Sequence, residues 1–175
     1  MPTFDAPAEI VAQLTWWWDN LYWPRLRGLT DDEYLWEPVP SLSIRDGVVE
    51  QERTPFGERG PFTTIAWRMY HLIDGVFGLR LATHVDHTAT SHDDFVAPAP
   101  PVNAADAMAT MYWLYERWID AVAARGAEGF AQPCGPAEHV FADYPFAALV
   151  LHINREVIHH GAEIMTMRDL YRARA

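Results

Sequence analysis

Residues 144–172, from Tyr144 to Arg172, read YPFAALVLHINREVIHHGAEIMTMRDLYR. The apolar residues of this stretch return every three or four positions, a spacing that places them on one face of an α-helix. This seam consists of Phe146, Val150, Ile153, Val157, His160, Ile164 and Met167. The stretch therefore predicts a long amphipathic helix whose buried face includes a histidine.

Three further segments show the same periodicity, at about residues 7–27, 63–83 and 103–126. Their seams comprise Ile10, Leu14, Trp17 and Leu21 in the first, Ile65, Met69, Leu72, Val76 and Leu79 in the second, and Ala107, Met111, Leu114, Trp118 and Ala121 in the third. Signals at the ends agree with these spans. Thr64 and Asn103 are suitable N-caps, and Gly126 is a suitable stop. Pro24 is expected to kink or fray the end of the first helix.

Four amphipathic helices predict an all-α protein with the architecture of a four-helix bundle. The connections between the helices are long. Residues 28–60 include a candidate hairpin, formed by Leu42-Ser-Ile and Val48-Val-Glu around a turn at Asp46-Gly47. The length of the chain, 175 residues, suits a single domain over residues 1–175.

The composition argues against some classes of partner. The formal net charge is −11, from 13 basic and 24 acidic residues, which disfavours binding to nucleic acid. The single cysteine, Cys134, cannot form an internal disulfide, which fits a reducing compartment. No basic and apolar leader opens the sequence and no stretch is apolar enough to span a membrane, so we expect a cytoplasmic protein without membrane contact. The abundance of aromatic residues suggests a homodimer.

One group of candidate metal ligands lies on the predicted fourth helix. His152, Glu156 and His160 follow at intervals of four residues, which stacks them one turn apart. Zinc, nickel, iron and manganese all accept imidazole nitrogen and carboxylate oxygen. Two ligands one turn apart need a third from another helix, and His71, in the middle of the second helix, is the natural candidate. His152 is expected to support the site without binding the metal.

Each histidine also has a structural interpretation. A lone Glu-x-x-x-His pair, such as Glu156 and His160, usually makes only an intrahelical contact. Burial in an apolar seam would leave both groups in need of a cation. His71 lies at the margin of its apolar stripe, which suits a pocket wall or a solvent-facing residue equally. His159 is expected on the outer surface, and His139 has no evident partner. Structural roles are expected for the loop histidines His84, His87 and His92.

Three stretches resemble the DinB-like four-helix bundle family. They are Thr64-Ile-Ala-Trp-Arg-Met-Tyr-His71-Leu, Asn154-Arg-Glu156-Val-Ile-His-His160-Gly-Ala-Glu-Ile and Tyr34-Leu-Trp36-Glu-Pro-Val-Pro. Most members of that family carry two histidines four residues apart on the last helix. The Arg-Glu-x-x-x-His pattern is similar instead to the branch that includes the metal-binding N-terminal domain of mycothiol-dependent maleylpyruvate isomerase. The resemblance favours His71, Glu156 and His160 as the metal triad.

The resemblance also implies a function. It implies a divalent metal, zinc or alternatively nickel, and mycothiol or a similar small thiol. We expect a thiol-dependent transferase in which a metal-activated thiolate attacks an electrophile, with Tyr34 and Trp36 lining the substrate pocket. The residues identify no catalytic acid or base. The alternative is a non-catalytic module that binds metal or another ligand.

Overall fold

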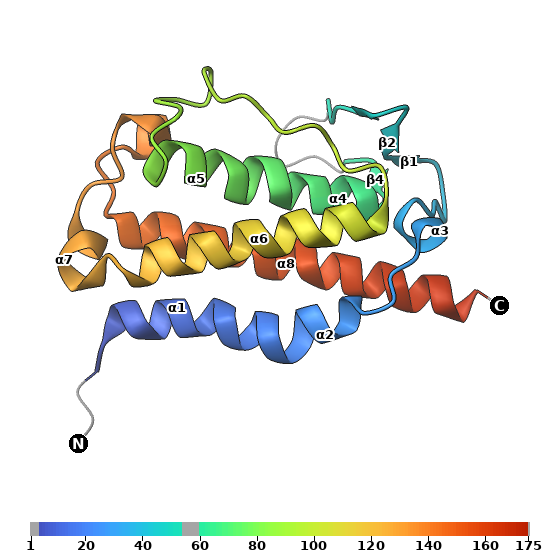
Figure 1. Cartoon of the computed structure of the whole chain (residues 1–175), viewed down its shortest axis with the longest axis horizontal. Coiled ribbons are helices and arrows are strands. Elements are labelled where there is room, and N and C mark those ends of the chain that lie inside the picture. The colour runs from blue at the N-terminus through green and yellow to red at the C-terminus, as the bar shows by residue number, and fades with distance from the viewer. Residues whose placement is uncertain (1–3, 54–59, 175) are drawn as a thin grey trace.

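The computed structural model describes residues 4–53 and 60–174, and this part of the chain is mostly helical (Figure 1). Four long helical segments lie side by side (Figure 1). They are α1 (Ala6–Trp17) continued by η1 (Trp18–Tyr22) and α2 (Trp23–Leu26); α4 (Ile65–His71) continued by η2 (Leu72–Gly78) and α5 (Leu79–His84); α6 (Ala104–Ala123); and α8 (Phe146–Ala173). Short helices α3 (Asp31–Tyr34), α7 (Gly126–Ala131) and η3 (Pro136–Phe141) lie in the connections. The all-α expectation is confirmed.

The connection between α3 and α4 contains the few strand residues. Strand β2 (Ile44–Arg45) pairs antiparallel with β3 (Val48–Val49), which confirms the predicted turn and second strand. The first strand of the hairpin begins at Ile44, later than predicted, because Leu42 pairs with a different strand. Both turn residues have positive φ, 52° at Asp46 and 74° at Gly47, as a tight type I′ turn requires. A second pair, β1 (Ser41–Leu42) parallel to β4 (Phe62–Thr63), was not predicted. It ties this connection to the start of α4.

Two of the predicted helices are interrupted by π-helical turns. In the first, η1 precedes Pro24, which lacks an N–H group and whose ring would clash with a carbonyl one turn earlier in a continuous α-helix. In the second, η2 follows His71 directly. A Cβ atom on Gly78 would lie 2.6 Å from the carbonyl oxygen of Ile73, so this turn requires a residue without a side chain. The turn changes the helical phase between His71 and the residues of α5.

A close contact between α1 and α8 lies beside His160. A Cβ atom on Gly161 would lie 2.3 Å from the indole of Trp17, so the glycine permits the two helices to approach. Near the other end of α8, the buried Arg168 donates to Glu33 of α3 at 2.6 Å. These contacts fix the long helix that carries the predicted metal ligands. Among the described helices, none is both long and apolar enough to cross a membrane.

Candidate metal centre

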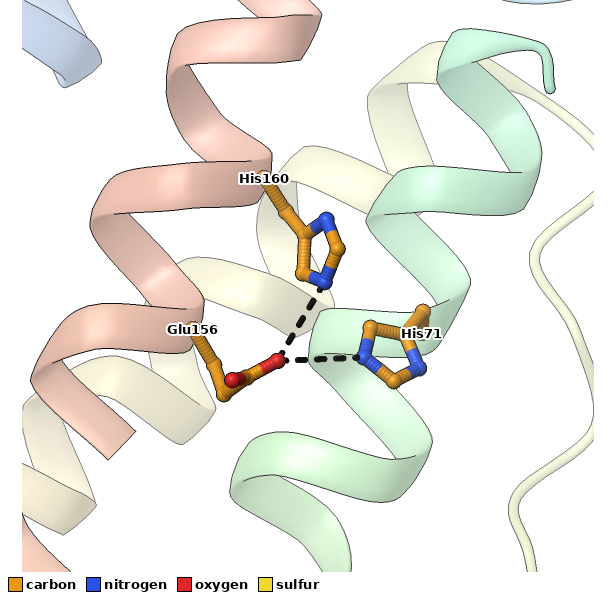
Figure 2. Close-up of side chains that lie close together, drawn as sticks. All are labelled: His71, Glu156 and His160. Atoms are coloured by element: carbon orange, nitrogen blue, oxygen red, sulfur yellow. Dashed lines mark ion pairs between the residues drawn. The ribbon is translucent and has the colours of Figure 1, made fainter. Parts of the chain in front are cut away.

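Three side chains converge between α4 and α8. His71 is the last residue of α4, whereas Glu156 and His160 lie one turn apart on α8 (Figure 2). The Oε2 atom of Glu156 lies 3.3 Å from Nε2 of His160 and 4.0 Å from Nε2 of His71. The two imidazole rings meet edge to face, with centroids 4.7 Å apart. The fold thus brings together the three residues that the sequence assigned to a metal.

The spacing of these atoms suits a small divalent cation. One ligand atom of each residue lies within 4.8 Å of the other two. Tetrahedral zinc with bonds of about 2.0–2.2 Å separates its ligand atoms by about 3.4 Å. The Glu156 to His160 distance already matches that value, and His71 needs a small approach. Two imidazoles and one carboxylate leave a fourth position open, as in catalytic zinc sites.

The proton of His160 is positioned by Glu163, one turn further along α8. Nδ1 of His160 lies 2.8 Å from Oε2 of Glu163. Arg68 also approaches this nitrogen, at 3.3 Å, but a guanidinium can only donate, and its Nε pairs with Glu163 at 3.1 Å. We therefore assign the proton to Nδ1, donated to Glu163. The lone pair on Nε2 then faces Glu156.

This assignment brings two hydrogen-bond acceptors face to face. Nε2 of His160 and Oε2 of Glu156 are 3.3 Å apart, and with a neutral His160 and an ionised Glu156 both atoms are acceptors. Such a pair is repulsive unless a proton or a metal cation lies between its members. Glu163 stays ionised in its supporting role. Burial raises the pKa of Glu163, but the hydrogen bond from His160 and the charge of Arg68 outweigh it and leave the pKa below its usual value.

Glu156 is held in its anionic form. The neighbouring His71 contributes most to this and burial opposes it, while the positive charges that His152 and His160 carry when protonated add to the effect. Together they lower the pKa of Glu156 to about 2. Among the described residues, its oxygens have ion-pair neighbours but no hydrogen-bond donor. The carboxylate is therefore charged at neutral pH and available to a cation.

The predicted supporting residue, His152, lies next to Glu156. Its Nδ1 lies 3.6 Å from Oε1 of Glu156 and 2.7 Å from Nη2 of Arg155. Burial is the main cause that lowers the pKa of His152, so the ring is neutral near pH 7. His159 has a side chain that is 62% exposed, in agreement with its expected surface position. His159, with His160 and Glu163, forms a second group of possible metal ligands. In this group the guanidinium of Arg68 already pairs with Glu163 and would compete with a metal cation for that carboxylate.

A second acid-base cluster joins α5 to η3. Nε2 of His84 lies 2.9 Å from Oε1 of Glu138, and Nη2 of Arg80 donates to Oε2 at 3.2 Å. All three residues are buried. His84 was expected in a loop with a structural role; it is instead the last residue of α5, and its contacts are structural. Arg80 and Glu138 were not singled out from the sequence, because they lie 58 positions apart and η3 leaves no periodic signal.

The remaining histidines lie around this second cluster. Nδ1 of His87 contacts the carbonyl oxygen of Thr83 at 3.2 Å, which supports its expected structural role. The ring of His92 packs edge to face against that of His139, with centroids 4.9 Å apart. His139 has a positive φ of 48°. The partner of His139 that the sequence left unassigned is therefore His92.

A cavity of about 830 Å³ connects the two clusters. Glu156, His152 and Arg155 line it from α8, and Arg80, His92 and Glu138 line it from the second cluster. The rest of its wall is mostly apolar and comes from η3, the following loop and the start of α8. A molecule bound in this cavity would lie beside Glu156.

The two residues expected to line a substrate pocket lie elsewhere. Tyr34 is fully buried, and its hydroxyl donates to the carbonyl oxygen of Pro101 at 2.9 Å. Trp36 packs against Tyr171, with ring centroids 5.5 Å apart, near the C-terminal end of α8. Neither residue lines the cavity beside Glu156. The geometry therefore gives their expected role no support. The expectation failed because the neighbours of both residues depend on the path of a long connection, which the local sequence does not determine.

Comparison with known proteins places the chain at the level of a family. No curated protein and no solved structure matched it. The family model of the DinB superfamily matches residues 13–164, which include His71, Glu156 and His160 and most of the chain. The branch that uses mycothiol is not distinguished by this match. The chain belongs to the DinB superfamily.

Proposed function

We propose that this protein is a metal- and low-molecular-weight-thiol-dependent transferase of the mycothiol type. The observation that carries the proposal is the pair of facing acceptors, Nε2 of His160 and Oε2 of Glu156, with His71 as a third ligand beside them. Such a set favours a cation and leaves room for an exogenous ligand. The cavity that reaches Glu156 offers space for a second reactant.

The residues divide into ligands and supporting groups. His71, Glu156 and His160 would hold a divalent metal, zinc or alternatively nickel. Glu163 fixes the proton of His160, and Arg68 keeps Glu163 charged and in place. When bound, the metal would lower the pKa of a coordinated thiol, so that a thiolate forms near neutral pH. Glutamate at the first position of the Glu-x-x-x-His pair supports the mycothiol branch of the family.

The proposed reaction is a substitution or addition by sulfur. A C–S bond forms between the thiolate and an electrophilic carbon, and the electron pair goes to the leaving group or to a conjugated carbonyl. The thiol proton passes to solvent when the thiolate forms. An added substrate takes a proton back from solvent, so the protein need not supply an acid.

The test offers zinc-loaded protein a thiol and the reporter electrophile 1-chloro-2,4-dinitrobenzene, with mycothiol and bacillithiol as the thiols. We expect conjugation by the wild-type protein and no conjugation above background by Glu156→Ala. Glu128→Ala, at an exposed position of α7, is the matched control and should behave as wild type. Equal rates for wild type and Glu156→Ala with every thiol would contradict catalysis.

A cobalt-substituted sample separates the two candidate functions. A thiol that binds the metal changes the visible spectrum of cobalt, whereas a module without thiol chemistry leaves it unchanged. A spectrum that no thiol alters, together with stoichiometric metal, would favour the non-catalytic binding module.

A further inference from the structure

The cavity beside Glu156 has a mostly apolar wall in which a few polar side chains lie. Phe141, Tyr144 and Leu149 contribute to the apolar part. One of these polar side chains is Arg80, a residue that is only 8% exposed. A cavity of about 830 Å³ is large enough for a small organic molecule. The polar groups in such a cavity determine which molecule it accepts.

The hydrogen bonds of Arg80 are incomplete. Nη1 donates to the carbonyl oxygen of Gly75 at 3.0 Å, and Nη2 donates to Glu138 at 3.2 Å. Among the described residues, the buried Nε has no partner, and neither does the buried Nε2 of His92 in the same cavity wall. A guanidinium carries five N–H donors and no acceptor. The unmet requirement at Arg80 is therefore a hydrogen-bond acceptor.

The charge of Arg80, in contrast, is already balanced. Glu138 pairs with it, and burial, the largest influence on this carboxyl, raises its pKa. The hydrogen bond with His84 and the charge of Arg80 more than offset burial, so that Glu138 stays ionised. The site consequently does not need an anion and accepts an oxygen acceptor whether or not it is charged. At Arg80 a cationic group would meet a like charge and offer no acceptor, so it is disfavoured there.

We propose that this cavity binds an apolar molecule that carries a carbonyl or carboxylate oxygen, and that Arg80 donates a hydrogen bond to this oxygen with His92 as a second polar contact. The assignment of that molecule as the electrophilic substrate rests on the proposed function. Arg80 is joined to the metal centre through η2, because it donates to Gly75, and a Cβ atom on Gly75 would lie 3.6 Å from Nδ1 of His71. A ligand held by Arg80 lies in the same cavity as Glu156.

The test measures binding of three matched probes to zinc-loaded protein by isothermal titration calorimetry. The probes are 4-phenyl-2-butanone, 4-phenylbutyrate and 4-phenylbutan-2-amine, which present a carbonyl, a carboxylate and an ammonium group on similar apolar bodies. We expect one or both oxygen probes to bind and the amine not to bind. The same titrations on metal-free protein exclude coordination of the probe oxygen to zinc. Equal binding of all three probes would overturn the proposal, since it would indicate apolar burial alone.

Variants then assign the contact to Arg80. Arg80→Met should weaken binding of the oxygen probe by about tenfold or more, the usual effect of losing a charged donor. Arg155→Met removes the same charge from an exposed residue of the same cavity and should change binding by less than about threefold. Equal weakening by both variants would overturn the assignment.

A second variant covers the case in which Arg80→Met fails to fold, as it leaves Glu138 buried without its cation. The double variant Arg80→Met/Glu138→Gln removes the pair together, and its thermal unfolding verifies the fold. Unchanged probe binding by this folded variant overturns the inference. If the oxygen probes bind in a manner that depends on Arg80 but the protein conjugates no thiol, the ligand site is supported and the proposed function is contradicted. Conjugation without binding of any oxygen probe overturns the inference alone.

Discussion

Two glutamates of this protein sit among histidines and arginines, yet their surroundings differ. Glu138 is 6% exposed, and each of its oxygens is within hydrogen-bond distance of a protein donor, on His84 and Arg80. Glu156 has a side chain that is 25% exposed, lies at a cavity and, among the described residues, accepts no hydrogen bond. Both are ionised. The contact with His71 is the main cause that lowers the pKa of Glu156, and at Glu138 burial raises the pKa but the contacts with His84 and Arg80 outweigh it.

The difference shows why residue type does not distinguish a structural cluster from a binding site. Glu138 has its donors inside the protein, so its charge is already neutralised and hydrogen-bonded. Glu156 faces a nitrogen whose proton is directed away, toward Glu163. Its unmet requirement is a cation. The number of unsatisfied acceptors, and not the presence of histidine and glutamate, identifies Glu156 as the candidate ligand.

The largest expected effect concerns Glu138. Glu138→Ala should lower the free energy of unfolding by about 3–5 kcal/mol, because it leaves the buried Arg80 without its anion. Glu156→Ala, in metal-free protein, should lower it by less than about 1 kcal/mol, because the side chain is partly solvated. Urea unfolding followed by circular dichroism measures both values. Similar losses in the two variants would remove the distinction between the clusters.

The second effect concerns metal. Glu156→Ala/His160→Ala should weaken zinc binding by more than about 100-fold, since the loss of supporting partners alone costs up to about that much. Titration calorimetry with zinc and metal analysis after dialysis measure the change. Glu138→Gln, which keeps a polar partner for His84, should retain one zinc per chain. Zinc retained by the first variant and lost by the second would place the metal in the other cluster.

The features that could be predicted from the sequence are those that depend on residues close together in the chain. The helices and the stacking of Glu156 and His160 follow from local periodicity, and they were predicted. Glu163 lies three residues after His160 and could have been found by the same spacing. The π turn could not, because it depends on the missing Cβ of Gly78 and on packing around it.

Contacts between distant segments of the chain were harder to predict from the sequence. The pairing of Arg80 with Glu138 joins residues 58 positions apart, in segments whose relative placement no local rule determines. Tyr34 and Trp36 were expected at a pocket because aromatic residues in a long loop often line one. Their actual neighbours, Pro101 and Tyr171, come from distant segments. The aromatic character of Tyr34 and Trp36 predicted that they would pack against other residues, but not which residues these would be.

A smaller effect tests the support given by Glu163. Glu163→Gln should weaken zinc binding by about tenfold, because a neutral amide accepts the proton of His160 less strongly and lowers the basicity of Nε2. Glu128→Gln makes the same change at an exposed position of α7 and should leave the affinity unchanged. Titration calorimetry of both variants decides the matter. Unchanged affinity in Glu163→Gln would mean that the tautomer of His160 is fixed by other means.

The smallest expected effect is a pH dependence in metal-free protein. The folded-state pKa of Glu156 is about 2, below its usual value of 4.5, so its charge stabilises the fold above pH 4.5 and the contribution is lost as the pH falls toward 2. The unfolding free energy of wild type minus that of Glu156→Gln should therefore be positive at pH 5 and shrink steadily at pH 4 and pH 3. The difference should stay below about 1 kcal/mol, because the group is partly exposed.

Glu128→Gln, where the carboxylate faces solvent, should show no such trend. A difference that grows as the pH falls would show that Glu156 is destabilised by its surroundings, and the favourable contact with His71 would then have to be abandoned.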